Sequence, residues 1–277
     1  MIRGSPTPFV VLAFPRTGST WLMDMLNSHP EVAAYGELFN VEADGPAYAS
    51  TDLPYFEEYL ARLPERRRRL RLLHGMTYLR RLYSDRPGIR AVGFKLLYGQ
   101  AGANPRLLHL LALRRVRAVH LTRVNLLDAL ISWKAAQATG VYAVRTEQAA
   151  TRTRVTLNAE RLRDRLREQD LAVSRARGRL ERLRLRWIEV AYEELVGRRE
   201  ESLLRILGFL DVHPDVGLLD SGIVRMSRGS SVDLVENLPE VRAALAGTRF
   251  EWMLEDAEAG PKGLRPPAPR ASTVPAA

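Results

Sequence analysis

The 277-residue sequence predicts an α/β fold, a three-layer sandwich in which helices cover both faces of a central parallel sheet of four to five strands. Short buried-strand patterns alternate with helical patterns along the chain, and this order is typical of parallel sheets. The first strand pattern leads directly into a tight turn and then a helix, which is the arrangement of a phosphate-binding loop.

Four segments read as strands, at residues 9–14, 91–97, 117–122 and 187–192. Each is short, apolar or β-branched, and separated from the next by a helical pattern, so we expect all four to be buried strands. A shorter strand at residues 31–35 would bring the sheet to five.

Amphipathic patterns predict the helices around these strands. We expect them at residues 19–28, 54–83, 125–138, 157–184 and 200–210. The second segment is broken into two helices at Pro64. Asn125 caps the third, with Asp128 three positions later as the second half of a capping pair. The fourth is rich in arginine and weakened at Gly178.

We expect one domain over residues 1–258, because a chain of this length can bury a sizeable core. The segment 259–277 is rich in proline and alanine, which predicts a disordered tail. The sequence contains no apolar run of the roughly 20 residues that span a membrane. Its first residues, MIRGSPTP, lack the apolar core of a signal peptide. These features favour a cytoplasmic protein without a transmembrane segment.

The sequence has no cysteine, and its five histidines show no metal-ligand spacing. We therefore expect no disulfide, no thiolate nucleophile and no bound metal. The net charge of +10 rests on arginine, since lysine occurs only at Lys95, Lys134 and Lys262. A GC-rich coding sequence accounts for most of the arginines, and a field that attracts anionic ligands accounts for a few.

The arginine-rich stretch ERRRRLRLL at residues 65–73 is a candidate nucleic-acid arm. Base stacking would need aromatic residues between the arginines, and the stretch has none. We interpret it as a solvated helix face, with Leu70, Leu72 and Leu73 turned inward.

The turn at residues 15–21 has the composition of an anion site. Backbone N–H groups converge at a helix start, and Gly18 lets the backbone approach a ligand closely. Ser19 and Thr20 offer hydroxyls, and Arg16 offers a planar cation suited to phosphate or sulfate oxygens. An ATP-binding loop would need a further glycine and a lysine before the hydroxyl residue, so a magnesium–nucleotide site is disfavoured.

The sequence P-R-T-G-S-T-W after a strand resembles the 5′-phosphosulfate loop of sulfotransferases that use 3′-phosphoadenosine 5′-phosphosulfate (PAPS). The resemblance covers residues 9 to about 250. It implies an enzyme that moves a sulfuryl group from PAPS to a hydroxyl acceptor and releases the desulfo nucleotide PAP, without a metal. The donor-binding residues that it implies in this loop are Arg16, Thr17, Gly18, Ser19, Thr20 and Trp21.

A second anion site follows from the 3′-phosphate of PAPS. Arg123 ends the strand 117–122, and Ser132 lies about two helical turns after Asn125, on the face of the helix start. The pair resembles the family's 3′-phosphate element. The spacing from Arg123 to Ser132 is one residue longer than is usual in the cytosolic aryl and steroid sulfotransferases. This spacing and the R-x-N opening resemble those of bacterial enzymes that sulfate carbohydrates and glycolipids. The resemblance implies a sugar-containing glycolipid or natural product as the acceptor.

Two further segments resemble the same family. Tyr192, after the strand 187–192, holds the place of a tyrosine that contacts the adenine, and Trp21 matches an aromatic residue that packs on the same base. The segment RMSRGSSVDLVENLPEVRAALAGT resembles the loop and helix that close over PAPS. There the resemblance points to Arg228 and Gly229 as donor-binding residues.

The general base departs from the pattern of the cytosolic relatives. Their histidine stands two residues after a strand lysine, but here Leu97 follows Lys95. The carbohydrate-type enzymes resemble this chain instead in a Gly-Glu pair, which identifies Glu37 as the candidate base. The resemblance implies that Arg16 stabilises the transferring group, and that Lys95 either assists or forms an ion pair.

Two alternatives remain open from the sequence. An ATP-dependent phosphotransferase on a related phosphate-binding fold would need the lysine that the loop lacks. A non-enzymatic, basic nucleic-acid-binding protein would show tight, salt-sensitive binding of DNA or RNA. For a sulfotransferase, the expected partners are a nucleotide donor and a hydroxyl-bearing small molecule or carbohydrate, without nucleic acid. A homodimer is compatible with the sequence, which leaves the oligomeric state open.

Overall fold

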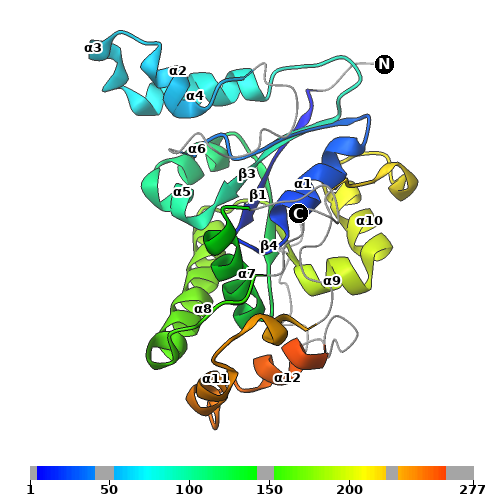
Figure 1. Cartoon of the computed structure of the whole chain (residues 1–277). Coiled ribbons are helices and arrows are strands. Elements are labelled where there is room, and N and C mark those ends of the chain that lie inside the picture. The colour runs from blue at the N-terminus through cyan, green and yellow to red at the C-terminus, as the bar shows by residue number, and fades with distance from the viewer. Residues whose placement is uncertain (1–4, 41–52, 142–152, 223–229, 260–277) are drawn as a thin grey trace.

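The computed structural model describes residues 5–40, 53–141, 153–222 and 230–259 (Figure 1). Its centre is a five-stranded sheet in the order β2-β3-β1-β4-β5, with every neighbouring pair parallel. The strands are β1 (Thr7–Ala13), β2 (Val32–Tyr35), β3 (Ala91–Leu97), β4 (Arg117–Thr122) and β5 (Trp187–Ala191). The predicted α/β class and all five predicted strands are therefore confirmed.

Helices follow each strand in the described part of the chain. They are α1 (Ser19–Ser28), α2 (Phe56–Ala61), α3 (Glu65–Arg68), α4 (Arg71–Leu82), α5 (Tyr98–Ala103), α6 (Leu107–Leu113), α7 (Leu126–Thr139), α8 (Ala159–Arg182), α9 (Tyr192–Gly197), α10 (Arg199–Phe209), α11 (Leu238–Leu245) and α12 (Trp252–Ala259). Two short 3₁₀ turns are η2 (Val216–Leu218) and η3 (Ser231–Leu234).

The side chains of β1 alternate between two hydrophobic cores, as the pleat of a strand requires. Val10 and Leu12 face a core shared with α4, α6 and α8, whereas Phe9, Val11 and Ala13 face a core shared with α1 and α10. Figure 1 shows α5, α6 and α8 on one side of the sheet and α1, α9 and α10 on the other. This arrangement confirms the predicted three layers.

A third hydrophobic cluster lies beyond the sheet. It joins α7 and the first half of α8 to η3, α11 and α12, with Ile131, Leu166 and Val241 fully buried in it. The predicted cap of α7 is present, because the side chain of Asn125 accepts a hydrogen bond from the backbone N–H of Asp128.

Three details of the helices differ from the prediction. The segment 54–83 forms three helices, because Leu70 takes a non-helical backbone and adds a second break after the one at Pro64. Leu70, Leu72 and Leu73 are exposed rather than inward, because α4 buries its later residues, such as Tyr78 and Leu79, in the core. The helices α5, α6, α9 and α12 had no counterpart in the prediction.

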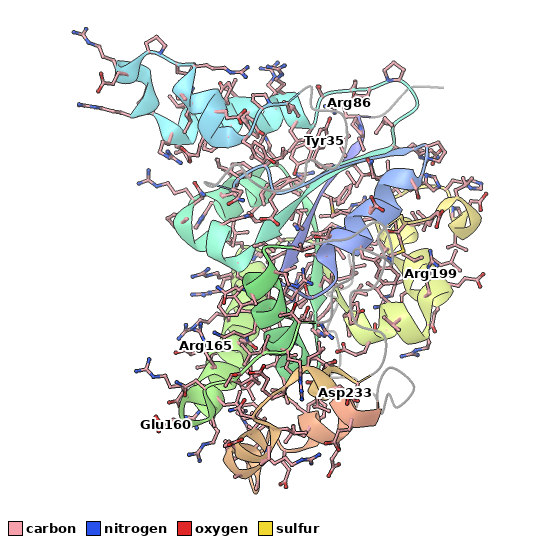
Figure 2. All side chains as sticks on the ribbon, in the orientation of Figure 1. Tyr35, Arg86, Glu160, Arg165, Arg199 and Asp233 are labelled. Atoms are coloured by element: carbon pink, nitrogen blue, oxygen red, sulfur yellow. The ribbon has the colours of Figure 1, made fainter. Side chains whose placement is uncertain are left out.

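The helix α8 is a single element of 24 residues that runs through Gly178 without a break. Ala176 and Leu180, on either side of the glycine, are buried against the sheet. This packing offsets the cost of about 1 kcal/mol that a glycine brings to a helix interior. Elsewhere along α8, arginines such as Arg165 are exposed (Figure 2).

The C-terminal prediction is only partly covered by the structure. Residue 259 ends α12, and the rest of the predicted tail lies outside the described residues. Within the described ranges, none of the helices combines the length and apolar character that crossing a membrane requires.

A buried hydrogen-bond network ties α8 to the sheet. Arg177 donates to both carboxylate oxygens of Glu189, at 2.6 and 2.7 Å, and Nδ1–H of the fully buried His120 donates to Glu189 at 3.0 Å. Burial and repulsion by Glu189 raise the pKa of Tyr98. Tyr98 therefore keeps its proton and donates it to Nε2 of His120.

The Glu189 carboxylate should make stability depend on pH. Burial disfavours its charge, but hydrogen bonds from His120 and Arg177 outweigh that effect and lower its pKa from 4.5 to about 2. Because the folded pKa is the lower one, this stabilisation is complete above about pH 4.5 and is lost as the pH falls toward 2. We expect Glu189→Gln to cost about 2 kcal/mol at pH 7, allowing for partial exposure.

Urea unfolding of both proteins at pH 7 and pH 3.5 measures this contribution. The difference in unfolding free energy should shrink by roughly 1 kcal/mol at the lower pH. A difference that stayed constant would contradict an ionic role for Glu189.

Candidate active site

The predicted site residues gather at the carboxyl ends of the strands. Along this edge, in the order of the sheet, lie Glu37 after β2, Lys95 near the end of β3, the loop 14–18 after β1, Arg123 after β4 and Tyr192 after β5. Open parallel sheets bind their ligands outside this edge. Strand order thus brings together residues that are far apart in the sequence.

The loop 14–18 turns sharply into α1. Arg16 has a positive φ of 66°, and Gly18, the N-cap of α1, is left-handed with φ 81°. The Thr17 hydroxyl donates to the carbonyl of Phe14 at 2.9 Å, so it stabilises the turn itself. A Cβ at Gly18 would lie 2.5 Å from the ring of Tyr192, which leaves room for glycine alone.

The first turn of α1 completes this anion site. Its free backbone N–H groups and the positive end of the helix dipole favour a negative ligand. Ser19 is buried in this turn, and Thr20 accepts a hydrogen bond from Lys95. The loop therefore combines a left-handed turn, a helix start and neighbouring hydroxyls, and its binding of an anion stays a prediction.

Arg16, Arg123 and Ser132 converge on one place. Nε of Arg16 donates to the Ser132 hydroxyl at 3.1 Å, and the Arg123 guanidinium donates to the backbone carbonyl of Arg16, also at 3.1 Å. The two predicted anion elements are thus neighbours, linked through Arg16.

Arg123 is held in place by two acidic residues. Its guanidinium donates to Asp128 at 3.1 Å and lies 4.8 Å from the ring centroid of Tyr192. Burial raises the pKa of Glu193, while the charge of Arg123 and backbone N–H groups of Val124 and Asn125 act in the opposite direction. Glu193 thereby holds the end of β4 against β5.

One polar atom of Arg123 is left unsatisfied. Its Nε is buried and has no hydrogen-bond partner among the described residues. A buried donor without a partner is costly, and an anionic ligand would remove that cost. This observation fits a negatively charged group beside Arg123.

Two aromatic residues predicted to hold a base lie together. The rings of Trp21 and Tyr192 meet edge to face, with centroids 6.3 Å apart. Arg199, at the start of α10, covers the Trp21 ring at 5.9 Å (Figure 2). The pair lies next to the loop because Tyr192 also packs on Gly18.

Glu37 and the loop are connected through Lys95. The Lys95 ammonium forms an ion pair with Glu37 Oε1 at 2.6 Å and donates to the Thr20 hydroxyl at 2.9 Å. The side chain of Lys95 is buried, whereas Glu37 is 21% exposed. Lys95 therefore connects a partly exposed carboxylate, Glu37, to the first turn of α1.

Gln100 positions Glu37 and was missed by sequence reasoning. Its amide Nε2 donates to Glu37 Oε2 at 2.5 Å, and its Oε1 accepts the backbone N–H of Leu97 at 3.1 Å. The second bond caps α5 and fixes which way the amide faces. Only the glutamine half of a capping box is present at this helix start, because Leu97 has no side-chain acceptor, so the sequence carried no complete signal for α5.

The predicted closing loop is only partly visible. Arg228 and Gly229 lie outside the described residues. Beyond them, Ser230 donates to the carbonyl of Ala257 at 2.7 Å, and Ser231 donates to Asp128, the partner of Arg123. The start of η3 therefore contacts the residues that hold Arg123.

The arrangement suits group transfer between two bound molecules. It offers two neighbouring cationic positions, at Arg16 and Arg123, and a carboxylate, Glu37, whose ion-pair partner Lys95 also contacts Thr20. A transferred anionic group can be held at the loop while a hydroxyl approaches from the side of Glu37.

Comparison with known proteins agrees with this chemistry. The family described as the sulfotransferase family matches residues 8–215. The nodulation protein H of Rhizobium meliloti (strain 1021) is 27% identical over 257 residues, which are 90% of this chain and 96% of that protein. The nodulation protein H of Rhizobium tropici is 56% identical over 36 residues, only 14% of its length.

Solved structures with some similarity are also sulfotransferases. One is the sulfotransferase from Alicyclobacillus acidocaldarius, at 15% identity and a TM-score of 0.45, with 91% of this chain and 97% of that chain covered. Another is sulfotransferase STF9 from Mycobacterium avium, at 14% identity and a TM-score of 0.45, with 88% and 76% covered.

The family match spans β1 to β5 and includes the loop 14–18, Glu37, Lys95, Arg123 and Tyr192. This match favours a sulfotransferase over the two alternatives, a phosphotransferase and a non-enzymatic nucleic-acid-binding protein. The chain belongs to the sulfotransferase family and is an enzyme that transfers sulfuryl groups.

Proposed function

We propose that this enzyme takes the sulfuryl group from PAPS and transfers it to a hydroxyl of a sugar-containing acceptor, with Glu37 as the general base. The observation that carries the proposal is the buried Lys95, which contacts both the donor loop at Thr20 and the carboxylate of Glu37. It joins the residue that would take the proton to the loop that would hold the leaving group.

The donor has two anionic ends, and the site has two places for them. The loop 14–18, the first turn of α1 and Arg16 would hold the 5′-phosphosulfate. Arg123 and Ser132 would hold the 3′-phosphate, with the unsatisfied Nε of Arg123 as a donor. Trp21 and Tyr192 would contact the adenine.

The transfer step follows from these positions. The acceptor oxygen bonds to sulfur as the bond from sulfur to the bridging phosphate oxygen breaks, and the hydroxyl proton passes to Glu37. Arg16 and Lys95 stabilise the negative charge that develops on the bridging oxygen. Such chemistry depends on position and electrostatics more than on covalent catalysis.

Glu37 has room for a third hydrogen-bond donor. Each of its carboxylate oxygens receives one hydrogen bond, from Lys95 and from Gln100. An ionised carboxylate has about four acceptor sites, so two donors leave room for the acceptor hydroxyl. The two fixed donors also orient the carboxylate before the acceptor binds.

The class of acceptor follows from the sequence resemblance described above. The R-x-N opening at Arg123 and the spacing to Ser132 are the features that are similar to enzymes acting on carbohydrates and glycolipids. We therefore propose a glycolipid or a sugar-bearing natural product as the acceptor.

Incubation with PAPS and a panel of acceptors tests the proposal. We expect a mass gain of one sulfuryl group on a glycolipid or sugar-bearing natural product, with release of PAP. Replacement of PAPS by ATP and Mg²⁺ is the matched control and should give no product. If no sugar-bearing compound were modified while simple phenols were, the proposed acceptor class would be wrong.

A further inference from the structure

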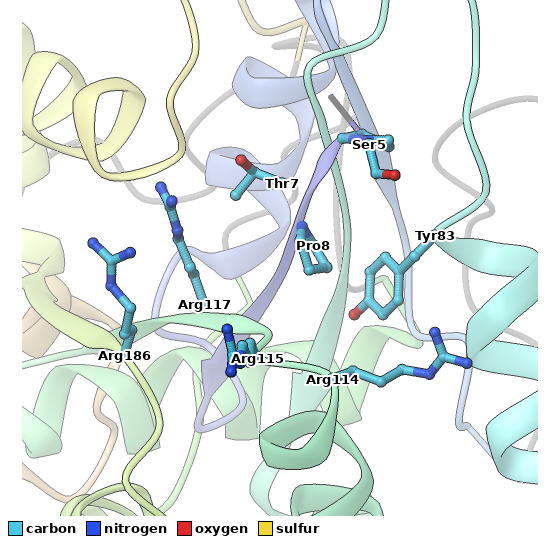
Figure 3. Close-up of a pocket in the computed structure, with 9 residues that line it drawn as sticks. Ser5, Thr7, Pro8, Tyr83, Arg114, Arg115, Arg117 and Arg186 are labelled. Atoms are coloured by element: carbon cyan, nitrogen blue, oxygen red, sulfur yellow. The ribbon is translucent and has the colours of Figure 1, made fainter. Parts of the chain in front are cut away.

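A second cationic site lies at the opposite edge of the sheet. A pocket of about 580 Å³ opens at the amino ends of β1 and β4 and just before β5. Figure 3 shows the residues that line it. They are Ser5, Pro6, Thr7, Pro8, Tyr83, Arg114, Arg115, Arg117 and Arg186. The size falls within the range of small-molecule sites, roughly 300–1,000 Å³.

The four arginines of this pocket are poorly neutralised. Within the described residues, their recorded ion pair is that of Arg117 with Asp211. Arg114 donates to the carbonyl of Met76, and its Nε is buried without a partner. Arg115 and Arg186 are exposed at the rim. Among the described residues, one carboxylate is therefore paired with one of these four guanidinium groups.

The backbone of this edge is unusual as well. The helices α6, α8 and α10 each end with a left-handed residue, at Arg115 (φ 53°), Arg184 (φ 50°) and Asp211 (φ 57°). In each case the next N–H returns to a carbonyl in the last turn of the helix, which is the Schellman pattern. Glycine is the usual residue there, because it adopts this backbone without strain.

A purely structural role is a weaker account of these arginines. Cations stabilise helix carboxyl ends, each of which carries about half a negative charge. Three such ends cancel about one and a half of the three uncompensated charges, so the pocket stays positive. Arg114 caps α6 through its backbone N–H, whereas its guanidinium donates to the carbonyl of Met76 in α4. The strained Arg115 beside it is then unexplained by helix stability.

The floor of the pocket is suited to an organic molecule. Pro6 and Pro8 supply apolar surface. The Tyr83 hydroxyl donates to the carbonyl of Phe9, so the aromatic ring is the part of Tyr83 that is left to line the pocket. Arginine forks match the planar geometry of phosphate and sulfate oxygens. Apolar floor and cationic rim together match an anion with a carbon framework.

We propose that this pocket binds a soluble small molecule that carries two or more phosphate or sulfate groups, at a site separate from the active site. The seven residues of β1 separate the two edges by about 20 Å, at roughly 3.3 Å per residue. A sulfuryl donor bound at the carboxyl edge therefore does not reach these arginines. The inference does not depend on PAPS being that sulfuryl donor.

Calorimetric titration with inositol hexakisphosphate and with inorganic pyrophosphate, at fixed ionic strength, tests the site. The pocket variant is Arg115→Gly with Arg186→Gln. We expect it to weaken binding by about 30-fold or more, because two charge-assisted contacts are lost. Both side chains are exposed and glycine suits the backbone at 115, so the loss would report missing charge rather than unfolding.

Two control variants locate the binding. Arg163→Gln with Arg167→Gln removes the same charge from the exposed face of α8 and should change affinity less than about 3-fold. Arg123→Ala alters the carboxyl edge and should leave the probe's affinity unchanged. The proposal is overturned if the wild-type chain does not bind either probe, if both double variants weaken binding equally, or if Arg123→Ala alone abolishes it.

Discussion

Glu37→Gln is expected to lower kcat by about 100- to 10,000-fold, the range that a positioned general base contributes. Glutamine keeps the size of the side chain and a carbonyl oxygen for Lys95 or Gln100, so the local structure should persist. It cannot take the proton of the acceptor hydroxyl. Steady-state kinetics at saturating PAPS, with the acceptor found in the panel, measure the effect.

Binding of PAP separates this chemical role from a structural one. In the described part of the chain, the side chain of Glu37 pairs with Lys95 and Gln100, so the Kd for PAP should change less than about 3-fold. Glu57→Gln is the matched control, because Glu57 also forms an ion pair, with Arg71, but lies on α2 away from the site. A kcat of Glu37→Gln close to the wild-type value would contradict the base assignment.

Arg123→Ala is expected to weaken PAP binding by about 10- to 100-fold, because hydrogen bonds from a buried guanidinium to phosphate are lost. The effect should be selective. Adenosine 5′-phosphate lacks the 3′-phosphate and should lose much less affinity than PAP. Calorimetry with both nucleotides at one salt concentration gives the ratio.

Two further variants keep that experiment interpretable. Arg123→Ala leaves Asp128 and Glu193 without their cation, so Arg123→Gln, which keeps polar atoms beside both, serves as the milder substitution. Arg249→Ala removes an exposed arginine paired with Asp170 and should leave PAP affinity unchanged. Equal losses for PAP and adenosine 5′-phosphate would show that Arg123 does not bind the 3′-phosphate.

The proposed reaction and the amino-edge pocket place anions at both ends of one sheet. The two sites use different physics. At the carboxyl edge, the N-terminus of α1 adds positive potential to Arg16 and Arg123. At the amino edge, three helix carboxyl ends oppose the arginines, so only an excess of guanidinium groups can hold an anion there.

Much of the fold could be predicted because most strands and helices follow from patterns of neighbouring residues. The five strands are short runs, largely buried in β1, β3 and β4, and α1 follows a strand and a glycine turn. The prediction of individual helices was wrong where tertiary packing overrode local helix propensity. Burial of Ala176 and Leu180 carries α8 through Gly178, and the unpredicted break at Leu70 exposes the leucines expected to turn inward.

By itself, the sequence determined the α/β class, the turn at 15–21 and the candidates Glu37, Arg123 and Ser132, since each depends on residues close together along the chain. Only the tertiary structure decided that Lys95 links Glu37 to Thr20, that Gln100 orients Glu37, and that four arginines meet at the amino edge. These contacts join residues that are distant in sequence. Strand order and helix packing create them, and no local periodicity encodes strand order.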